Sequence, residues 1–247
     1  MAASQHHVAF RFYAQLNDFL PRERQFAPFA HNYELHPSIK DMIESLGVPH
    51  PEIDLILVSG APVGFTYAVQ EGDRIAVYPA FKSLDVCSQL RPPLKDFQFV
   101  LDTHLGRLAT YLRLLGFDSV YATNRNDSEL ARISHDERRI LLTRDTGLLK
   151  RNEVIYGYFV RATNRIQQAI EVVRRFDLFR SISPFRRCLR CNSELFSVSK
   201  DSIIERLEPK TRQLYNEFRT CPSCNRLYWQ GSHYDHMRRL VQRILAD

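Results

Sequence analysis

The sequence has no run of apolar residues long enough to cross a bilayer. Its first twelve residues, MAASQHHVAFRF, lack the basic start and the apolar core of a signal peptide. Internal repeats and low-complexity tracts are absent as well. We therefore expect a cytoplasmic protein without a membrane partner.

Cysteine is scarce, with five residues in a chain of 247, and acidic residues are fewer than basic ones. Thirty-four Lys and Arg against 28 Asp and Glu give a formal net charge of +6, and the pI is about 9.1. This balance favours a polyanionic partner such as nucleic acid, although a basic protein without such a partner remains an alternative. Apolar residues make up 44% and charged residues 25%, as in ordinary globular proteins.

Residues 6–80 are predicted to form a small α+β domain. Val8, Phe10 and Phe12 alternate with other side chains in a half-buried strand, and residues 53–60 and 71–79 give two further strand candidates. One helix is expected on the apolar positions Ile39, Met42, Ile43 and Leu46, closed by Gly47. One helix over a few strands resembles the β-grasp fold of ubiquitin and of the sulfur carriers. The carriers end in a free Gly-Gly that this chain lacks, so a recruitment or packing role is preferred over sulfur transfer.

Residues 81–97, with Pro92 and Pro93, are expected to be a linker, and residues 98–180 alternate strand and helix patterns. Strands are expected at 99–101, 119–123, 139–145 and 154–160, and helices at 105–115, 128–138 and 165–176. Asn164 is placed to cap the last helix. Such alternation is typical of an α/β fold with a doubly wound parallel sheet.

Acidic residues follow the strands of this predicted sheet. Asp102 ends FVLD, Asp145 ends ILLTRD, and Asp127 and Glu129 begin the helix after the second strand. In an open parallel sheet the site lies beyond the carboxyl ends of the strands, so these acids are the catalytic candidates. Each also has a structural interpretation, because Asp102, Asp127 and Glu129 suit helix caps and Asp145 suits a turn.

Carboxylates gathered at one edge repel one another unless a cation neutralises them. Oxygen ligands suit magnesium or manganese, which can activate water and stabilise charge on a phosphoryl group. With a basic surface, this predicts phosphodiester hydrolysis. Phosphotransferases of the haloacid dehalogenase type also place an Asp after the first strand. They have a second Asp two residues later, where this chain has His104, which weakens that alternative.

Residues 181–247 contain two CxxC pairs, CLRC and CPSC, and a basic C-terminal helix. Four thiolates from two tight turns suit a closed, structural zinc site, formed by Cys188, Cys191, Cys221 and Cys224. A redox dithiol is the alternative. Cys87 is expected to be a plain thiol.

Basic and aromatic residues are interleaved around the cysteines. This pattern suits the gripping of phosphates and the stacking of bases, and a solvated basic face with Trp229 in a small core is the alternative. The candidate nucleic-acid contacts are Arg144, Arg187, Arg190, Arg226, Trp229 and His233.

The ordered series FVLDTHLGRLATYLRLLGFD, NDSELA, RILLTRD, PFRRCLRCN, CPSC and YWQGSH resembles the Mut-seven C-terminal RNase family. That family joins a PIN-like nuclease domain to a zinc ribbon, and some members add an N-terminal ubiquitin-like β-grasp domain. The resemblance implies that Asp102 and Asp145 are metal ligands and that Asp127, with Glu129 in reserve, is the third acid. This chain differs from the family pattern at NRND, because it has Asn124 and Asn126 in a segment where many relatives have more acidic residues.

The sequence-based hypothesis is a ribonuclease with three parts: a β-grasp domain at 6–80, a PIN-like domain at 98–180 and a zinc ribbon with its helix at 181–247. Magnesium or manganese would serve catalysis and zinc would be structural. RNA (tRNA, rRNA or another species) is the expected substrate, and the β-grasp domain would bind a protein partner or the nuclease itself. The alternative is a non-catalytic RNA- or ribosome-binding module that keeps the PIN-like fold.

Overall fold

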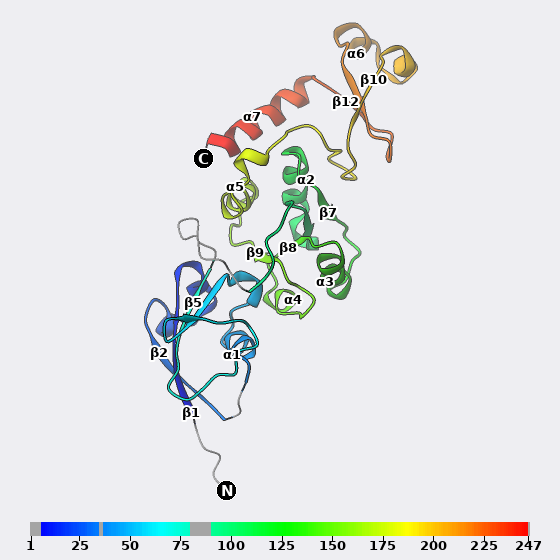
Figure 1. The fold of residues 1–247 in the computed structure, drawn as a ribbon. Helices are drawn as coiled ribbons and strands as arrows, with labels where there is room; N and C mark the ends of the chain where they lie inside the picture. Colours follow the sequence, from blue (N-terminus) through cyan, green and yellow to red (C-terminus); the bar gives the residue numbers. More distant parts are fainter. Residues whose placement is uncertain (1–5, 35–36, 80–89, 247) are drawn as a thin grey trace. The chain divides into compact units, whose positions relative to one another are not determined.

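The computed structural model describes residues 6–34, 37–79 and 90–246 of the chain (Figure 1). Its contacts group the residues into two compact units, one of residues 1–96 with 127–159 and one of residues 97–126 with 160–247. Cys87 and residues 81–89 of the predicted linker lie outside the described residues. Within those residues, no helix combines the length and the apolar character that a bilayer crossing requires.

A mixed five-stranded sheet in the order β2-β1-β5-β3-β4 opens the first unit. Its central strands β1 and β5 run parallel, and the other neighbours pair antiparallel. The strands are β1 (His6–Phe12), β2 (Phe29–Tyr33), β3 (Leu55–Val58), β4 (Ala61–Pro62) and β5 (Arg74–Tyr78). The helical segments are α1 (Ile39–Ser45) and the 3-10 turns η1 (Ala14–Phe19), η2 (Arg22–Arg24) and η3 (His50–Glu52). This is the predicted β-grasp arrangement.

The local sequence explains this domain. Val8, Phe10 and Phe12 alternate along β1, as predicted, and all three are buried in one core with Ile75 and Val77 of β5. Helix α1 begins where the Ser38 hydroxyl accepts a hydrogen bond from the Asp41 N–H. It ends at Ser45 with Leu46 as its C-cap, and the next residue is Gly47, whose φ of +108° and close approach to the Phe19 carbonyl oxygen both favour a residue without a side chain.

The first unit also contains α3 (Asp127–Asp136), β8 (Ile140–Thr143), α4 (Thr146–Leu149) and β9 (Gly157–Phe159). Strands β8 and β9 pair in parallel. Turn η3 of the β-grasp domain contacts β9, and there the buried Glu52 carboxylate accepts a hydrogen bond from the Phe159 N–H. His50 bridges Glu44 and the Val154 carbonyl oxygen, at 2.6 and 2.8 Å. Polar contacts thus join the β-grasp domain to this segment.

The second unit begins with β6 (Phe99–Leu101), the turn η4 (Thr103–Leu105), α2 (Gly106–Leu114) and β7 (Ser119–Tyr121). It continues with α5 (Arg165–Arg175), which contacts α2, and with the turn η5 (Leu178–Ser181). The pairs β6–β7 and β8–β9 are both parallel, and the four strands have the order β7-β6-β8-β9. Asn164 caps α5 by accepting hydrogen bonds from the N–H groups of Ile166 and Gln167, as predicted.

A three-stranded antiparallel ribbon in the order β10-β11-β12 follows in the second unit (Figure 1). Its elements are β10 (Phe196–Val198), η6 (Asp201–Arg206), α6 (Pro209–Leu214), β11 (Phe218–Thr220) and β12 (Leu227–Trp229). Helix α7 (Ser232–Ala246) comes last and contacts α5. The buried core of the ribbon is small and consists of Ile203, Leu207 and Phe218. The fold class is therefore as predicted: α/β with a parallel sheet, an N-terminal β-grasp domain and a C-terminal cysteine ribbon.

Candidate functional site

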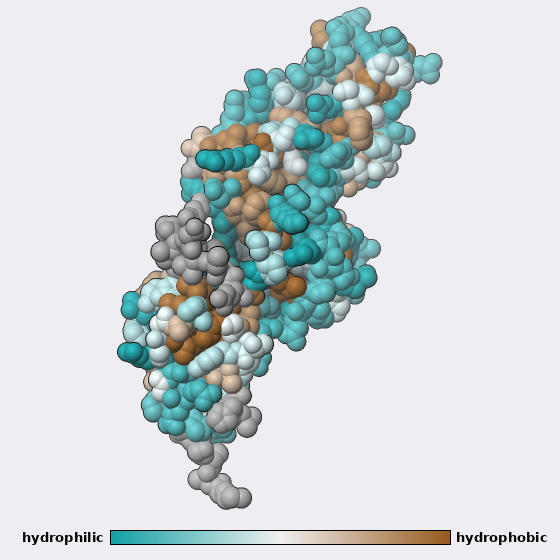
Figure 2. Space-filling view, viewed as in Figure 1, coloured by the Kyte–Doolittle hydropathy of each residue, from teal (hydrophilic) through white to brown (hydrophobic). Residues whose placement is uncertain are grey.

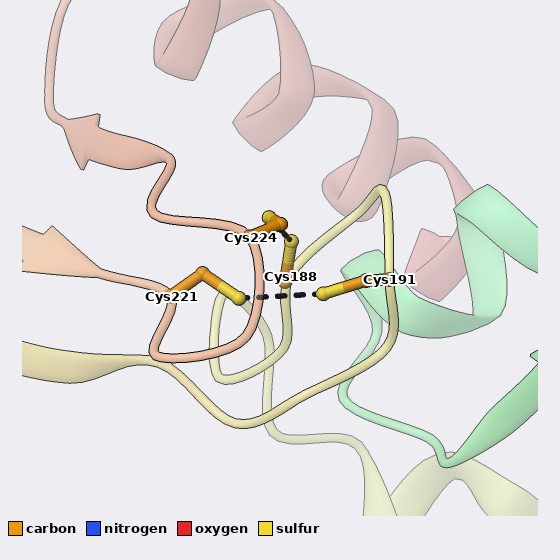
Figure 3. Close-up of side chains that lie close together, drawn as sticks. All are labelled: Cys188, Cys191, Cys221 and Cys224. Atoms are coloured by element: carbon orange, nitrogen blue, oxygen red, sulfur yellow. Dashed lines mark hydrogen bonds between the residues drawn. The ribbon is translucent and has the colours of Figure 1, made fainter.

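The four cysteines of the two CxxC pairs converge at one end of the ribbon (Figure 3). Their sulfur atoms all lie within 4.8 Å of one another, and none is in a disulfide. The Cys188 and Cys224 sulfurs are 3.5 Å apart, and those of Cys191 and Cys221 are 3.3 Å apart. The two pairs thus contribute to the same cluster, although 30 or more residues separate them in the sequence.

The two CxxC turns have the same backbone geometry. In each, the first cysteine N–H donates to a carbonyl five residues on, Ser193 in one turn and Arg226 in the other, at 2.8 and 2.9 Å. Asn192 and Asn225 follow the two pairs with positive φ angles of 76° and 59°. Asparagine tolerates this left-handed conformation better than most residues, which suits it to this position in both turns.

The thiols differ in acidity. Burial raises the pKa of the Cys191 thiol, but hydrogen bonds with Ser193 and the neighbouring thiols outweigh it and lower this pKa to about 6. Burial raises the pKa of the Cys221 thiol to about 12. A shared site of this kind ionises fully only when a cation displaces the remaining protons. Burial raises the pKa of Cys188 too, but its hydrogen bond with the Tyr228 hydroxyl, at 3.1 Å, helps to produce a net lowering.

The geometry of the cluster fits zinc. A tetrahedral zinc with Zn–S bonds of about 2.3 Å separates its sulfur ligands by about 3.8 Å, close to the sulfur–sulfur distances observed here. All four ligands would be thiolates, which leaves no open position for a substrate. The arrangement therefore suits a structural metal and not a catalytic one.

The first CxxC turn is attached to the second unit by side-chain hydrogen bonds. Asn192 accepts from the Ser119 N–H at the start of β7, at 2.9 Å, and donates to the Asp118 carboxylate, at 2.8 Å. The guanidinium of Arg113 on α2 donates to the carbonyls of Leu189 and Arg190, at 3.2 and 2.9 Å. It also donates twice to the Ser119 carbonyl. Burial lowers the pKa of Arg113. The four hydrogen bonds offset the cost of removing its charged guanidinium from water.

Asp102 directly follows β6 and is the N-cap of turn η4. Its side chain is 8% exposed and accepts hydrogen bonds from the backbone N–H and the hydroxyl of Thr103. The Tyr121 hydroxyl donates to the Thr103 carbonyl at 2.8 Å, which holds this turn against β7. A carboxylate at the end of a buried strand is therefore held in a fixed orientation.

Asp145 follows β8 and is the N-cap of α4. Its Oδ1 accepts hydrogen bonds from the N–H groups of Gly147 and Leu148, at 2.7 and 3.2 Å, and its own N–H donates to the Thr143 hydroxyl. Asp127 and Glu129 lie in the exposed first turn of α3. The capping role considered for Asp102 is thus present, and Asp145, for which a turn was considered, is a helix cap as well.

Two family models match the chain and together span most of it. The Mut7-C RNAse domain matches residues 97–241, and the Mut7-C ubiquitin domain matches residues 5–85. The chain belongs to the Mut7-C family. No curated protein and no solved structure matches it. The resemblance noted in the sequence is confirmed, including the N-terminal ubiquitin-like domain of this Mut7-C protein.

The six predicted nucleic-acid contacts of the Mut7-C protein differ in environment. Arg187 is half-buried, donates to the carbonyls of Gly116 and Asn192 and pairs with Asp118, so it has a structural role in the attachment of the ribbon. The others are exposed, and the Trp229 side chain is 39% exposed. They are Arg144, Arg190, Arg226, Trp229 and His233.

The sequence did not identify Arg113 and Asn192 as the residues that attach the ribbon of the Mut7-C protein. Arg113 is buried although it carries a charge. A signal was present, because Arg113 lies between Leu112 and Leu114 in the otherwise apolar run YLRLLG, where a cation needs buried partners.

Proposed function

We propose that this Mut7-C protein is a metal-dependent ribonuclease that hydrolyses RNA phosphodiester bonds. The observation that carries the proposal is that two buried strands of the RNAse-domain sheet, β6 and β8, are each followed directly by an aspartate, Asp102 and Asp145. In parallel sheets the carboxyl ends of the strands share one edge, which is where ligands bind. Asp127, with Glu129 in reserve, would add a third carboxylate from the start of α3.

These carboxylates would hold one or two magnesium or manganese ions, because hard cations prefer oxygen ligands. Such an ion, when bound, supplies a water of lowered pKa and stabilises charge on the phosphoryl group. The hydrogen bonds of Asp145 from Gly147 and Leu148 both end on Oδ1, so Oδ2 is the oxygen available to a cation. Two hydrogen bonds from Thr103 orient the Asp102 carboxylate. The chain itself therefore supplies preorganised ligands.

The remaining parts of the chain would bind and position the substrate. The exposed arginines Arg144, Arg190 and Arg226 would contact RNA phosphates, with Arg187, Trp229 and His233 at the ribbon, and zinc at the four cysteines would keep the ribbon folded. The division proposed is the β-grasp domain at 6–80, the nuclease at 98–180 and the ribbon at 181–247. The β-grasp domain contacts residues of the 127–159 segment through His50 and Glu52, which supports a role in packing on the nuclease.

Cleavage of end-labelled single-stranded RNA tests the proposal. The zinc-loaded full chain is assayed with magnesium, with manganese and with neither, beside Asp102→Asn and Asp145→Asn. The metal-free control contains no added magnesium or manganese and no chelator, because a chelator would also remove zinc from the cysteines. We expect cleavage only with added metal and a loss of at least about 100-fold in both variants, because each removes a charged ligand.

Asp136→Asn is the matched control, since Asp136 is an exposed acid at the other end of α3 and follows no strand. Wild-type rates in this control would show that the loss is specific to the strand-end acids. RNA binding without cleavage at any metal concentration would overturn the proposal in favour of a non-catalytic RNA- or ribosome-binding module.

A further inference from the structure

An open groove of about 540 Å³ lies in the second unit, on the ribbon. It is lined by residues of β10, β11 and β12, of the chain around Cys188 and of the start of α7. Its volume is in the range of small-ligand sites. In this part of the molecule Figure 2 shows hydrophobic residues (brown) at the surface between hydrophilic ones (teal), near β10 and β12 of Figure 1.

The groove is lined by aromatic rings in fixed positions. Phe185 and Tyr234 pack with their ring centroids 4.4 Å apart, and the Trp229 and Phe218 rings lie 6.4 Å apart. Gly231 leaves room beside the Trp229 indole, since a Cβ at Gly231 would lie 2.8 Å from the indole Nε1 atom. The Trp229 ring is 39% exposed beside the groove, and covering it with another flat group is favourable because apolar surface leaves water and the two rings stack.

Basic residues outnumber acidic ones both in this region and in the groove lining, where Arg187 and Arg219 stand against Glu217. Residues 181–247 contain twelve Arg and Lys against seven Asp and Glu, which gives +5 with neutral cysteines and +3 with zinc held by four thiolates. Arg219, which is exposed, lines the groove and donates one hydrogen bond to the Phe185 carbonyl, at 3.0 Å. Its guanidinium has further N–H groups for a phosphate. Asn216 and Gln230 add amides that can pair with the polar edge of a base.

We propose that this groove binds one unpaired nucleobase of a single-stranded RNA, stacked on Trp229, with a neighbouring phosphate on Arg219. The proposal rests on the proposed function and adds to it a subsite for the substrate. Single-stranded RNA is the occupant that the features favour together, because it combines flat bases with backbone charge and its unstacked bases are free to enter a pocket. An apolar peptide would use the rings but not the positive charge.

The sequence offers a direct probe, because Trp229 is the only tryptophan in the chain. The Asp102→Asn variant, loaded with zinc and used to prevent cleavage, is titrated with a short single-stranded RNA while its tryptophan fluorescence is recorded. An abasic oligonucleotide of the same length serves as the control, since it has the phosphates without the bases. We expect quenching by the RNA and little or none by the abasic strand.

Second substitutions in the Asp102→Asn protein then separate base stacking from electrostatic attraction to phosphates. Trp229→Leu should weaken binding of a dye-labelled RNA by about 5- to 100-fold, the range measured for loss of one stacked base. Phe196→Leu is the control, because Phe196 is a ribbon aromatic, 57% exposed, that does not line the groove. Arg219→Gln should reduce the salt dependence of binding by about one phosphate contact. Zinc content is measured in each variant, so that loss of the ribbon fold is detected.

Equal binding of RNA by Trp229→Leu and Phe196→Leu, or equal quenching by the abasic strand, would overturn the nucleobase site. The ribonuclease proposal has a separate readout. Metal-dependent cleavage with no quenching refutes the groove alone, whereas quenching by RNA without cleavage by the wild type refutes the nuclease alone. Quenching by an apolar peptide but not by RNA would assign the groove to a protein partner.

Discussion

The β-grasp domain at the start of the chain has a core of 17 buried apolar side chains among its described residues, whereas the ribbon near the end has three. Both regions contain short strands and long irregular connections. The first has an apolar core large enough for the hydrophobic effect to be its main source of stability. The second does not, and its four converging thiols suit a metal whose binding contributes about 10–16 kcal/mol in small zinc domains. One chain thus stabilises two modules of similar size by different means.

The largest expected effect is that of zinc removal. When a chelator strips zinc from the full chain, the amides of β10, β11 and β12 should exchange rapidly with deuterium, because a core of three residues cannot hold the ribbon. The amides of β1 and β5 should keep their protection. Hydrogen exchange with mass spectrometry measures both in one sample. If metal analysis shows that zinc has been removed and the ribbon amides still exchange slowly, zinc is not what stabilises the ribbon.

The next effect concerns one phenylalanine in each module. Phe10→Ala removes a fully buried ring that packs near Phe12 and Phe29, so the free energy of unfolding of the β-grasp domain should fall by about 3–5 kcal/mol. Phe218→Ala in the ribbon should leave one zinc per chain bound, because the thiolates dominate there. Hydrogen exchange in urea measures the unfolding of the β-grasp domain in Phe10→Ala, and Trp229 fluorescence measures the unfolding of the ribbon in Phe218→Ala. Loss of zinc from Phe218→Ala would show that apolar packing holds the ribbon.

A smaller effect should separate the two CxxC turns, which share a backbone geometry but not their contacts. Asn192→Gly keeps the positive φ and removes the hydrogen bonds to Ser119 and Asp118, at an expected cost of about 1–3 kcal/mol. Asn225→Gly makes the same change in the other turn, and no hydrogen bond of its side chain is present among the described residues, so its effect should stay within about 0.5 kcal/mol. Thermal unfolding of the zinc-loaded variants measures the difference. Equal effects would mean that the Asn192 side chain does not attach the ribbon.

The sequence predicted the elements whose apolar residues follow a clear period. Alternation identified β1 and β5, the helical spacing of Leu108, Leu112 and Leu115 identified α2, and an asparagine cap placed the start of α5. The strands β10, β11 and β12 were missed. Each has three residues, too few to show a period of two, and their apolar members pack in a core that the metal site organises.

The cysteine cluster was predictable because CxxC spacing favours a tight turn and two such pairs in one chain favour a shared metal over a redox dithiol. The groove on the ribbon was not predictable. Phe185, Arg219 and Tyr234 lie far apart in the sequence, and only the fold brings them to one groove. Trp229 was marked as a base-stacking candidate from its basic neighbours, and its exposure is in keeping with that role.

We propose that the soft thiolates of the ribbon bind zinc and that the hard carboxylates after β6 and β8 bind a second metal, and manganese binding tests this division most directly. Zinc-loaded protein is titrated with Mn²⁺ while the free ion is followed by electron paramagnetic resonance, beside the double variant Asp102→Asn with Asp145→Asn. We predict that the wild type binds one or two manganese ions without releasing zinc and that the double variant binds none with comparable affinity. Equal manganese binding by the two proteins would contradict the assignment of these aspartates as metal ligands.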